Sequence, residues 1–183
     1  MSAPRVKLDI DASREKLASL GCSYAAEALE ALLAEAVRNE MPAHVFLDRL
    51  LDTELAGREE RRIKAMLKVS KIPTGQTLEN FDFAFQPAIE RSRIETLATG
   101  SWIRSAEVLL LQGPPGVGKS HLLVALGIRA IELGFSAQYF RFDELMTALK
   151  ADAHLPASRI KARKYMSTAL LLIDEMGYAH QVA

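Results

Sequence analysis

The sequence predicts an α/β protein with a parallel sheet, preceded by a small all-α domain. Three observations lead to this fold class. The apolar run 108–112 enters the glycine-rich loop 113–120, a second apolar run over 169–173 ends in two carboxylates, and the first seventy residues show only helical periodicity. Strands that alternate with helices along a chain form parallel sheets, because each connection must cross back over the sheet.

Helical spacing begins near residue 17 and continues to about residue 72. Gly21 is a natural break and Ser23 a natural restart, which predicts a pair of helices carrying Leu17, Leu20, Leu29, Leu32, Leu33 and Val37. Pro42 suits the first turn of a third helix, which ends at 71–73. Its apolar stripe is predicted to be plain core of a helical domain over 1–72, without a catalytic role: Phe46, Leu50, Leu51, Leu55, Ile63, Met66 and Leu67.

The second half of this third helix is locally basic, which is best interpreted as a solvated face whose cations complement the helix dipole. A linker and leading helix are predicted over 73–106. Phe81, Phe83 and Phe85 suggest a linker that docks through aromatic rings. Pro87 can start a helix that Gly100 ends.

The remaining segment, 107–183, carries the predicted sheet. Its first strand, 108–112, feeds the loop and a helix over about 119–133 that Gly134 closes. A strand follows over 137–141, then a helix opened by Asp143 and a helical segment around 158–167. The last strand, 169–173, is a short apolar run typical of a buried parallel strand.

The loop reads Gly-Pro-Pro-Gly-Val-Gly-Lys-Ser, which is a complete G-x-x-x-x-G-K-S phosphate-binding motif between a strand and a helix. Such a turn points several backbone N–H groups into one concavity at the positive end of a helix dipole. Lys119 can reach the β- and γ-phosphates, and the Ser120 hydroxyl can ligate Mg²⁺. The predicted nucleotide-binding set is Gly113, Pro114, Pro115, Gly116, Val117, Gly118, Lys119, Ser120 and His121, with no specific chemistry for the histidine.

Two adjacent carboxylates end the strand over 169–173. Enough residues separate them from the loop for a helix, a strand and a further helical segment, which favours a Walker B strand. Asp174 would then hold the Mg²⁺ shell, and Glu175 would polarise the attacking water. Lys119 and Glu175 are therefore the candidate catalytic residues for hydrolysis of a bound nucleotide, and Ser120 and Asp174 the candidate metal ligands. The alternative is that the two carboxylates simply end a core strand.

Composition limits the remaining possibilities. The 183 residues are 49% hydrophobic and carry 23 cationic against 23 anionic side chains, so any nucleic-acid site must be a local patch. Cys22 is the single cysteine and cannot form an internal disulfide, which suits the reducing cytosol. No signal peptide or membrane span is visible in the sequence, so we expect a cytoplasmic protein without a membrane partner.

Four stretches together with the loop resemble one family. They are 26–33 (Ala-Glu-Ala-Leu-Glu-Ala-Leu-Leu), 54–62 (Glu-Leu-Ala-Gly-Arg-Glu-Glu-Arg-Arg), 77–83 (Thr-Leu-Glu-Asn-Phe-Asp-Phe) and 171–178 (Leu-Leu-Ile-Asp-Glu-Met-Gly-Tyr). In this order they look like the IstB-like ATP-binding proteins, the helper ATPases of insertion-sequence transposition, related to the helicase loader DnaC in the AAA+ class. The resemblance implies ATP and Mg²⁺ as cofactors. It implies DNA bound without sequence specificity, a cognate transposase and self-association through the AAA+ and helical domains.

The resemblance also gives meaning to two further groups of residues. In similar proteins the stretch matching 77–83 lies beside the adenine, so Phe81 or Phe83 would pack near the base; packing of the linker on the core is the alternative. The stretch matching 152–164 corresponds to a helix with which similar proteins touch DNA. Its cations form the candidate DNA site, against the alternative of a solvated helix face: Arg159, Lys161, Arg163 and Lys164.

The sequence departs from the family pattern after Tyr178. Similar proteins continue with a sensor-1 residue, an arginine finger and two more strands, whereas this chain reads Ala-His-Gln-Val-Ala over 179–183. We therefore expect an incomplete AAA+ core in which the segment 108–112 and the strand 169–173 either stay apart or collapse together. Three functions stay open: an impaired ATPase, a nucleotide- or DNA-binding module without turnover, and a non-functional remnant. A DnaC-like helicase loader is a further possibility.

Overall fold

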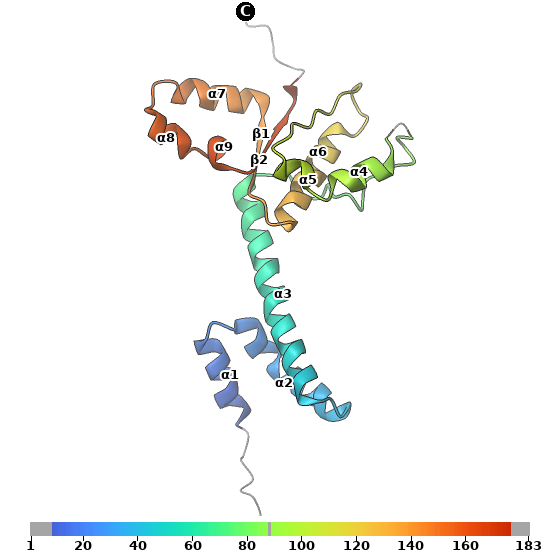
Figure 1. Ribbon diagram of the computed structural model, residues 1–183, viewed down its shortest axis with the longest axis vertical. Coiled ribbons are helices and arrows are strands. Elements are labelled where there is room, and N and C mark those ends of the chain that lie inside the picture. Colours follow the sequence, from blue (N-terminus) through green and yellow to red (C-terminus); the bar gives the residue numbers. More distant parts are fainter. Residues whose placement is uncertain (1–8, 88, 177–183) are drawn as a thin grey trace, which may run out of the picture. The chain divides into compact units, whose positions relative to one another are not determined.

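The computed structural model describes residues 9–87 and 89–176, in two compact units that divide between Arg62 and Ile63. The first unit holds α1 (Ile10–Ser19), α2 (Ser23–Arg38) and most of α3 (Ala43–Ser70) (Figure 1). The break at Gly21 is confirmed, because this residue has a φ of 76° between α1 and α2. The three helices enclose a small core of Ala25, Leu29 and Leu50, flanked by Leu17, Leu32 and Phe46.

The prediction that the stripe on α3 is plain core is wrong for two of its members. Leu51 and Leu55 are 52% and 64% exposed in the described structure. Glu54, which directly precedes Leu55, turns inward instead and is only 5% exposed. Its carboxylate accepts the Ala25 N–H at 2.9 Å and pairs with Arg58 at 2.6 Å. Glu54 thereby caps the first turn of α2, because the side chain of the N-cap residue Cys22 makes no capping hydrogen bond to this helix.

We expect Glu54→Gln to lower the thermal unfolding midpoint at pH 7 and to have a smaller effect at pH 3. The Ala25 N–H and the Arg58 guanidinium hold the pKa of Glu54 below its ordinary value. A carboxyl whose pKa is lowered by folding stabilises the protein above its unfolded pKa, and this contribution is lost as pH falls through the folded pKa. Melting curves between pH 7 and pH 3 measure the effect. Glu59→Gln, in an exposed pair with Arg62, is the control and should change little. An equal difference for Glu54→Gln at both pH values would contradict this role.

The second unit contains the sheet. It comprises the end of α3, α4 (Arg91–Leu97), α5 (Ser101–Arg104), α6 (Lys119–Glu132), β1 (Ala137–Arg141), α7 (Phe142–Asp152), α8 (Ala157–Lys161), α9 (Lys164–Ser167) and β2 (Leu170–Asp174). The two strands pair in parallel, with Ala137 opposite Leu170 and Arg141 opposite Asp174. This confirms a parallel α/β fold. Within this unit α6 packs against β2 and α7 against β1 (Figure 1).

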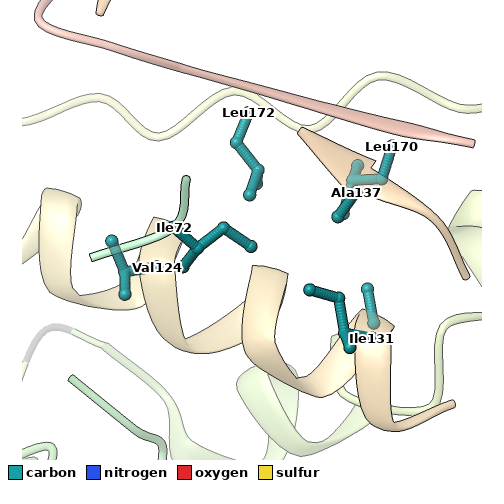
Figure 2. Close-up of a cluster of buried hydrophobic side chains, with 7 residues drawn as sticks. Ile72, Val124, Ile131, Ala137, Leu170 and Leu172 are labelled. Carbon is teal, nitrogen blue, oxygen red and sulfur yellow. The ribbon is translucent and has the colours of Figure 1, made fainter. Parts of the chain in front are cut away.

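The core of the second unit lies between α6 and the two strands. Val124 and Ile131 of α6 meet Ala137 of β1 and Leu172 of β2, as Figure 2 shows, and Ile131 is fully buried. Ile72 joins the same cluster, with Ile63, Met66 and Leu67 of α3 packed against it. The predicted boundary of the helical domain lay after residue 72, whereas this packing groups the last turns of α3 with the sheet.

Three predicted elements differ from the structure. Residues 108–112 form no strand, because among the described residues only β1 and β2 pair, and Val108 is 94% exposed. This corresponds to the expected arrangement in which the segment stays apart from β2: a cavity of about 290 Å³ is lined by both. The helix expected from Pro87 begins at Arg91, and the helical segment around 158–167 is divided into α8 and α9. Across 9–87 and 89–176, no helix combines the length and apolar character needed to cross a membrane.

Candidate functional site

The phosphate-binding loop ends at Gly118, which is the N-cap of α6. Gly118 has a φ of 86° and no side chain. The first N–H groups of α6 therefore receive no capping hydrogen bond from the side chain of the N-cap residue. These donors and the helix dipole favour an anion at this point. A Cβ at this residue would lie 2.7 Å from the Phe81 ring, which is a second reason for glycine here.

Lys119 is the first residue of α6, and its side chain turns back over the loop. Its Nζ donates to the Pro114 carbonyl oxygen at 2.7 Å. An ammonium group has three donors, so this contact leaves capacity for phosphate oxygens. The Pro114 carbonyl oxygen thus holds the Lys119 ammonium group above the loop.

Ser120, Asp174 and Tyr139 form a connected group of oxygens that come from the first turn of α6, the end of β2 and the middle of β1. The Ser120 hydroxyl donates to Asp174 Oδ1 at 3.0 Å, and the Tyr139 hydroxyl donates to Asp174 Oδ2 at 3.0 Å. Burial, followed by the charge of Asp174, raises the pKa of Tyr139 to about 12. The phenol therefore stays protonated and remains a donor across the physiological range.

Glu175 follows Asp174 in a left-handed backbone conformation, with a φ of 60°. Its N–H donates to Asp174 Oδ1 at 2.8 Å, and its exposed carboxylate pairs with the guanidinium of Arg141 at 2.7 Å. A non-glycine residue with this φ is strained, and such strain concentrates at functional sites. The carboxylate predicted to polarise water is thus held by a cation from the neighbouring strand.

The oxygens of Ser120 and Asp174 fit a magnesium ion that arrives with a nucleotide. Among the described residues, no group of three or more His, Cys, Asp or Glu side chains could hold a metal by itself. A hydroxyl 3.0 Å from a carboxylate instead supplies the hard oxygen ligands that Mg²⁺ takes alongside phosphates and water. The predicted metal pair is therefore brought together.

Two cavities flank the loop, and Gly113 and Lys119 line both of them. One, of about 590 Å³, is lined by Ser120, Asp174 and Glu175. The other, of about 560 Å³, is lined by apolar side chains that include Ile89, Ile94 and Val117, and also by the charged side chains of Glu90 and Arg93. Volumes of this size suit small-molecule ligands. The first has the chemistry for phosphates and Mg²⁺, and the second offers apolar side chains on which a base can pack, beside polar side chains that include Gln86 and Gln112.

Phe81 and His121 contact each other beside Gly118, the last glycine of the loop. Phe81 is 8% exposed and makes edge contacts with Phe83 and His121, with ring centroids 4.8 Å and 5.1 Å apart. The His121 Nε2 lies 2.9 Å from the Thr77 carbonyl oxygen and from Asn80 Oδ1. These contacts dock the linker against α6, and neither Phe81 nor Phe83 lines the apolar cavity beside the loop.

The four candidate DNA-binding cations lie on or beside α8 and α9, and they are exposed. Arg163 differs from the other three because its guanidinium pairs with Asp152 at 2.6 Å. Asp152 is 7% exposed and also accepts the Tyr165 hydroxyl at 2.7 Å. Arg163 and Tyr165 therefore tie the α8–α9 segment to the end of α7, which leaves Arg159, Lys161 and Lys164 as the candidates for phosphate contacts.

Tyr139 and Arg141 are the site residues that sequence reasoning missed. In the parallel register of β1 and β2, both side chains lie on the same face of the sheet as Asp174 of β2. The available signal was that Tyr139 and Arg141 lie two positions apart in the predicted strand 137–141, which places both side chains on one face. The sequence does not show that β1 and β2 are neighbours, so it could not predict that Tyr139 and Arg141 lie beside the carboxylates of Asp174 and Glu175.

The comparisons with known proteins agree with this arrangement. The family model for IstB-like ATP binding proteins matches residues 15–181. A relative named as an ATP-binding protein of insertion sequence IS5376, from Geobacillus stearothermophilus, is 35% identical over 84% of this chain and 61% of its own length. A relative named in the same way for IS21, from Pseudomonas aeruginosa, is 36% identical over 82% of this chain and 57% of its own length.

A third relative, named as an ATP-binding protein in an insertion sequence of Mycobacterium tuberculosis, is 28% identical over 94% of this chain and 68% of its own length. The chain thus spans about 60% of the length of the first two relatives. The match runs through both units, and within the described residues it includes the phosphate-binding loop and the two carboxylates, Asp174 and Glu175, at the end of β2. The chain therefore belongs to the IstB-like ATP-binding protein family, with a P-loop NTPase fold.

Proposed function

We propose that this chain binds ATP with Mg²⁺ at the loop 113–120 and serves as a helper protein in insertion-sequence transposition. The observation that carries the proposal is the meeting of Ser120 with Asp174, 3.0 Å apart, at the uncapped start of α6. The phosphates would occupy the loop and the cavity beside Asp174, and the base would enter the apolar cavity beside Val117. The names of the relatives support the association with insertion sequences.

Calorimetric titration with ATP, with and without Mg²⁺, tests the binding. We expect Mg²⁺ to strengthen ATP binding in the native chain and to do so much less in Asp174→Ala, because that variant lacks the carboxylate of the metal pair. Equal Mg²⁺ dependence in the two proteins would contradict the proposed metal site.

Turnover is a separate question from binding. Glu175 has the position of a residue that polarises water, but its carboxylate pairs with Arg141. An ATPase would release phosphate in multiple turnovers and lose this activity in Glu175→Gln. A binding module would bind ATP with the same affinity in both proteins and release no phosphate in either.

DNA and a transposase are the proposed macromolecular partners, with self-association through both units. For DNA, we expect binding to duplexes to be independent of sequence and to weaken steeply with salt, because the candidate cations meet phosphates and carry no base-reading pattern. Replacing Arg159, Lys161 and Lys164 with Gln should reduce the slope of log affinity against log salt by roughly two to three.

The matched control removes three other exposed cations, Arg61, Lys68 and Lys71, and has the same net charge. Its salt dependence should stay close to that of the native chain. If the two triple variants have the same slope, Arg159, Lys161 and Lys164 form only a solvated helix face. Arg163 is left intact in both variants, because its pairing with Asp152 would mix a structural effect into the measurement.

A further inference from the structure

The carboxylate of Asp174 receives hydrogen bonds from three parts of the second unit. Two of them, from the Ser120 hydroxyl and the Glu175 N–H, reach the same oxygen, Oδ1. Among the described contacts, Oδ2 has one donor, the Tyr139 hydroxyl at 3.0 Å. The orientation of the carboxylate plane therefore depends on a donor at each end, and Tyr139 is the one at Oδ2.

The strand register explains how Tyr139 reaches this oxygen. Tyr139 lies opposite Leu172 in the parallel ladder, so it shares a face with Asp174 and lies diagonally from it. Its ring packs against the core cluster of α6 and β2, which fixes the direction of the hydroxyl. The strand is anchored beside it, because the buried Gln138 side chain donates to the Ser70 carbonyl oxygen at 3.0 Å.

A neutral donor suits a metal-binding carboxylate better than a cation does. Arg141 is the residue directly opposite Asp174, yet its guanidinium pairs with Glu175 at 2.7 Å. A guanidinium on Asp174 would offset the negative charge that attracts Mg²⁺, whereas a phenol orients the carboxylate and leaves its charge in place. Ser120 could turn its oxygen to the metal while Tyr139 keeps hold of Oδ2.

We propose that Tyr139 is a positioning residue that holds Asp174 in the orientation required for Mg²⁺ bound with a nucleotide. This inference rests on the proposed Mg²⁺-dependent nucleotide site. Tyr139 touches neither the nucleotide nor the metal; it acts through Asp174. Hydrogen-bonded partners of metal-binding carboxylates typically change metal affinity by tenfold or more when they are removed.

The test compares Tyr139→Phe with Tyr165→Phe in the full chain. Both variants keep the ring and lose a hydroxyl that donates to an aspartate, Asp174 in one and Asp152 in the other. Mg²⁺ is titrated at a fixed concentration of a fluorescent ATP analogue. We expect Tyr139→Phe to raise the Mg²⁺ concentration for half-maximal binding about tenfold, with analogue binding in EDTA unchanged, and Tyr165→Phe to leave both unchanged.

A second comparison places Tyr139→Phe in the Asp174→Ala background, where it should have no further effect on Mg²⁺ dependence. The inference is overturned if Tyr139→Phe matches the native chain, if both tyrosine variants shift the Mg²⁺ response equally, or if the effect persists without Asp174. A native chain that binds the analogue with no response to Mg²⁺ would instead refute the proposed metal site, and this inference with it.

Discussion

Lys119→Ala should weaken ATP binding roughly tenfold to hundredfold. The ammonium lies at the start of α6 over the loop, held by the Pro114 carbonyl oxygen at 2.7 Å. A bound triphosphate would gain charge-assisted hydrogen bonds from it, which contribute about 1.5 to 3 kcal/mol. Because each factor of ten in affinity corresponds to about 1.4 kcal/mol, this range gives the expected loss. Calorimetric titration with ATP measures it directly.

Lys164→Ala is the matched control for this experiment. Lys164 is also the first residue of a helix, α9, but it lies outside both cavities that flank the loop. Its removal lowers the net charge equally and should leave ATP affinity unchanged. An unchanged affinity for Lys119→Ala, or an equal loss for the two variants, would show that the loop does not bind the phosphates.

Gly118→Ala should reduce both the stability of the second unit and its affinity for ATP. A residue with a side chain pays about 1 to 2 kcal/mol for the left-handed conformation that Gly118 adopts, with a φ of 86°. The new Cβ would also lie 2.7 Å from the Phe81 ring. Phe81 is held by Phe83 and His121, so relieving this contact costs about 1 to 3 kcal/mol more. Denaturant unfolding should show a total loss of about 2 to 5 kcal/mol.

Gly116→Ala separates the two causes. Gly116 also has a positive φ, 80°, but a Cβ there would meet no atom within 4 Å. It should therefore show the backbone cost alone and a smaller loss of unfolding free energy than Gly118→Ala. If the two variants lose the same stability, the close packing of Phe81 under Gly118 has no energetic importance.

Local patterns predicted the elements of this fold well because each depends on residues close together in the sequence. The strand 137–141 and the start of the helix at Lys119 are where periodicity and the glycine-rich loop placed them. The two helices separated by Gly21 follow from the same kind of signal. The family resemblance added the assignment of the family, which the match over residues 15–181 confirms.

What the sequence could not predict depends on which elements meet in space. Residues 108–112 have a strand-like composition, but a strand also needs a hydrogen-bonding neighbour, and none is present among the described residues. Glu54 was missed as a cap because its partner, the Ala25 N–H, is on another helix. For the same reason Tyr139 and Arg141 were not joined to the carboxylates. Their roles depend on the pairing of β1 with β2.

Amide hydrogen exchange of the native chain, measured with and without Mg²⁺ and ATP, tests most directly that the nucleotide binds at this loop. We expect slower exchange, when both are added, at the N–H groups from Gly116 to His121 and near Glu175, because the phosphates would take the loop donors and the metal would fix Asp174. Little change should occur in α1 and α2. ATP binding that leaves exchange at the loop unchanged, or slows it only elsewhere, would contradict nucleotide binding at the loop 113–120.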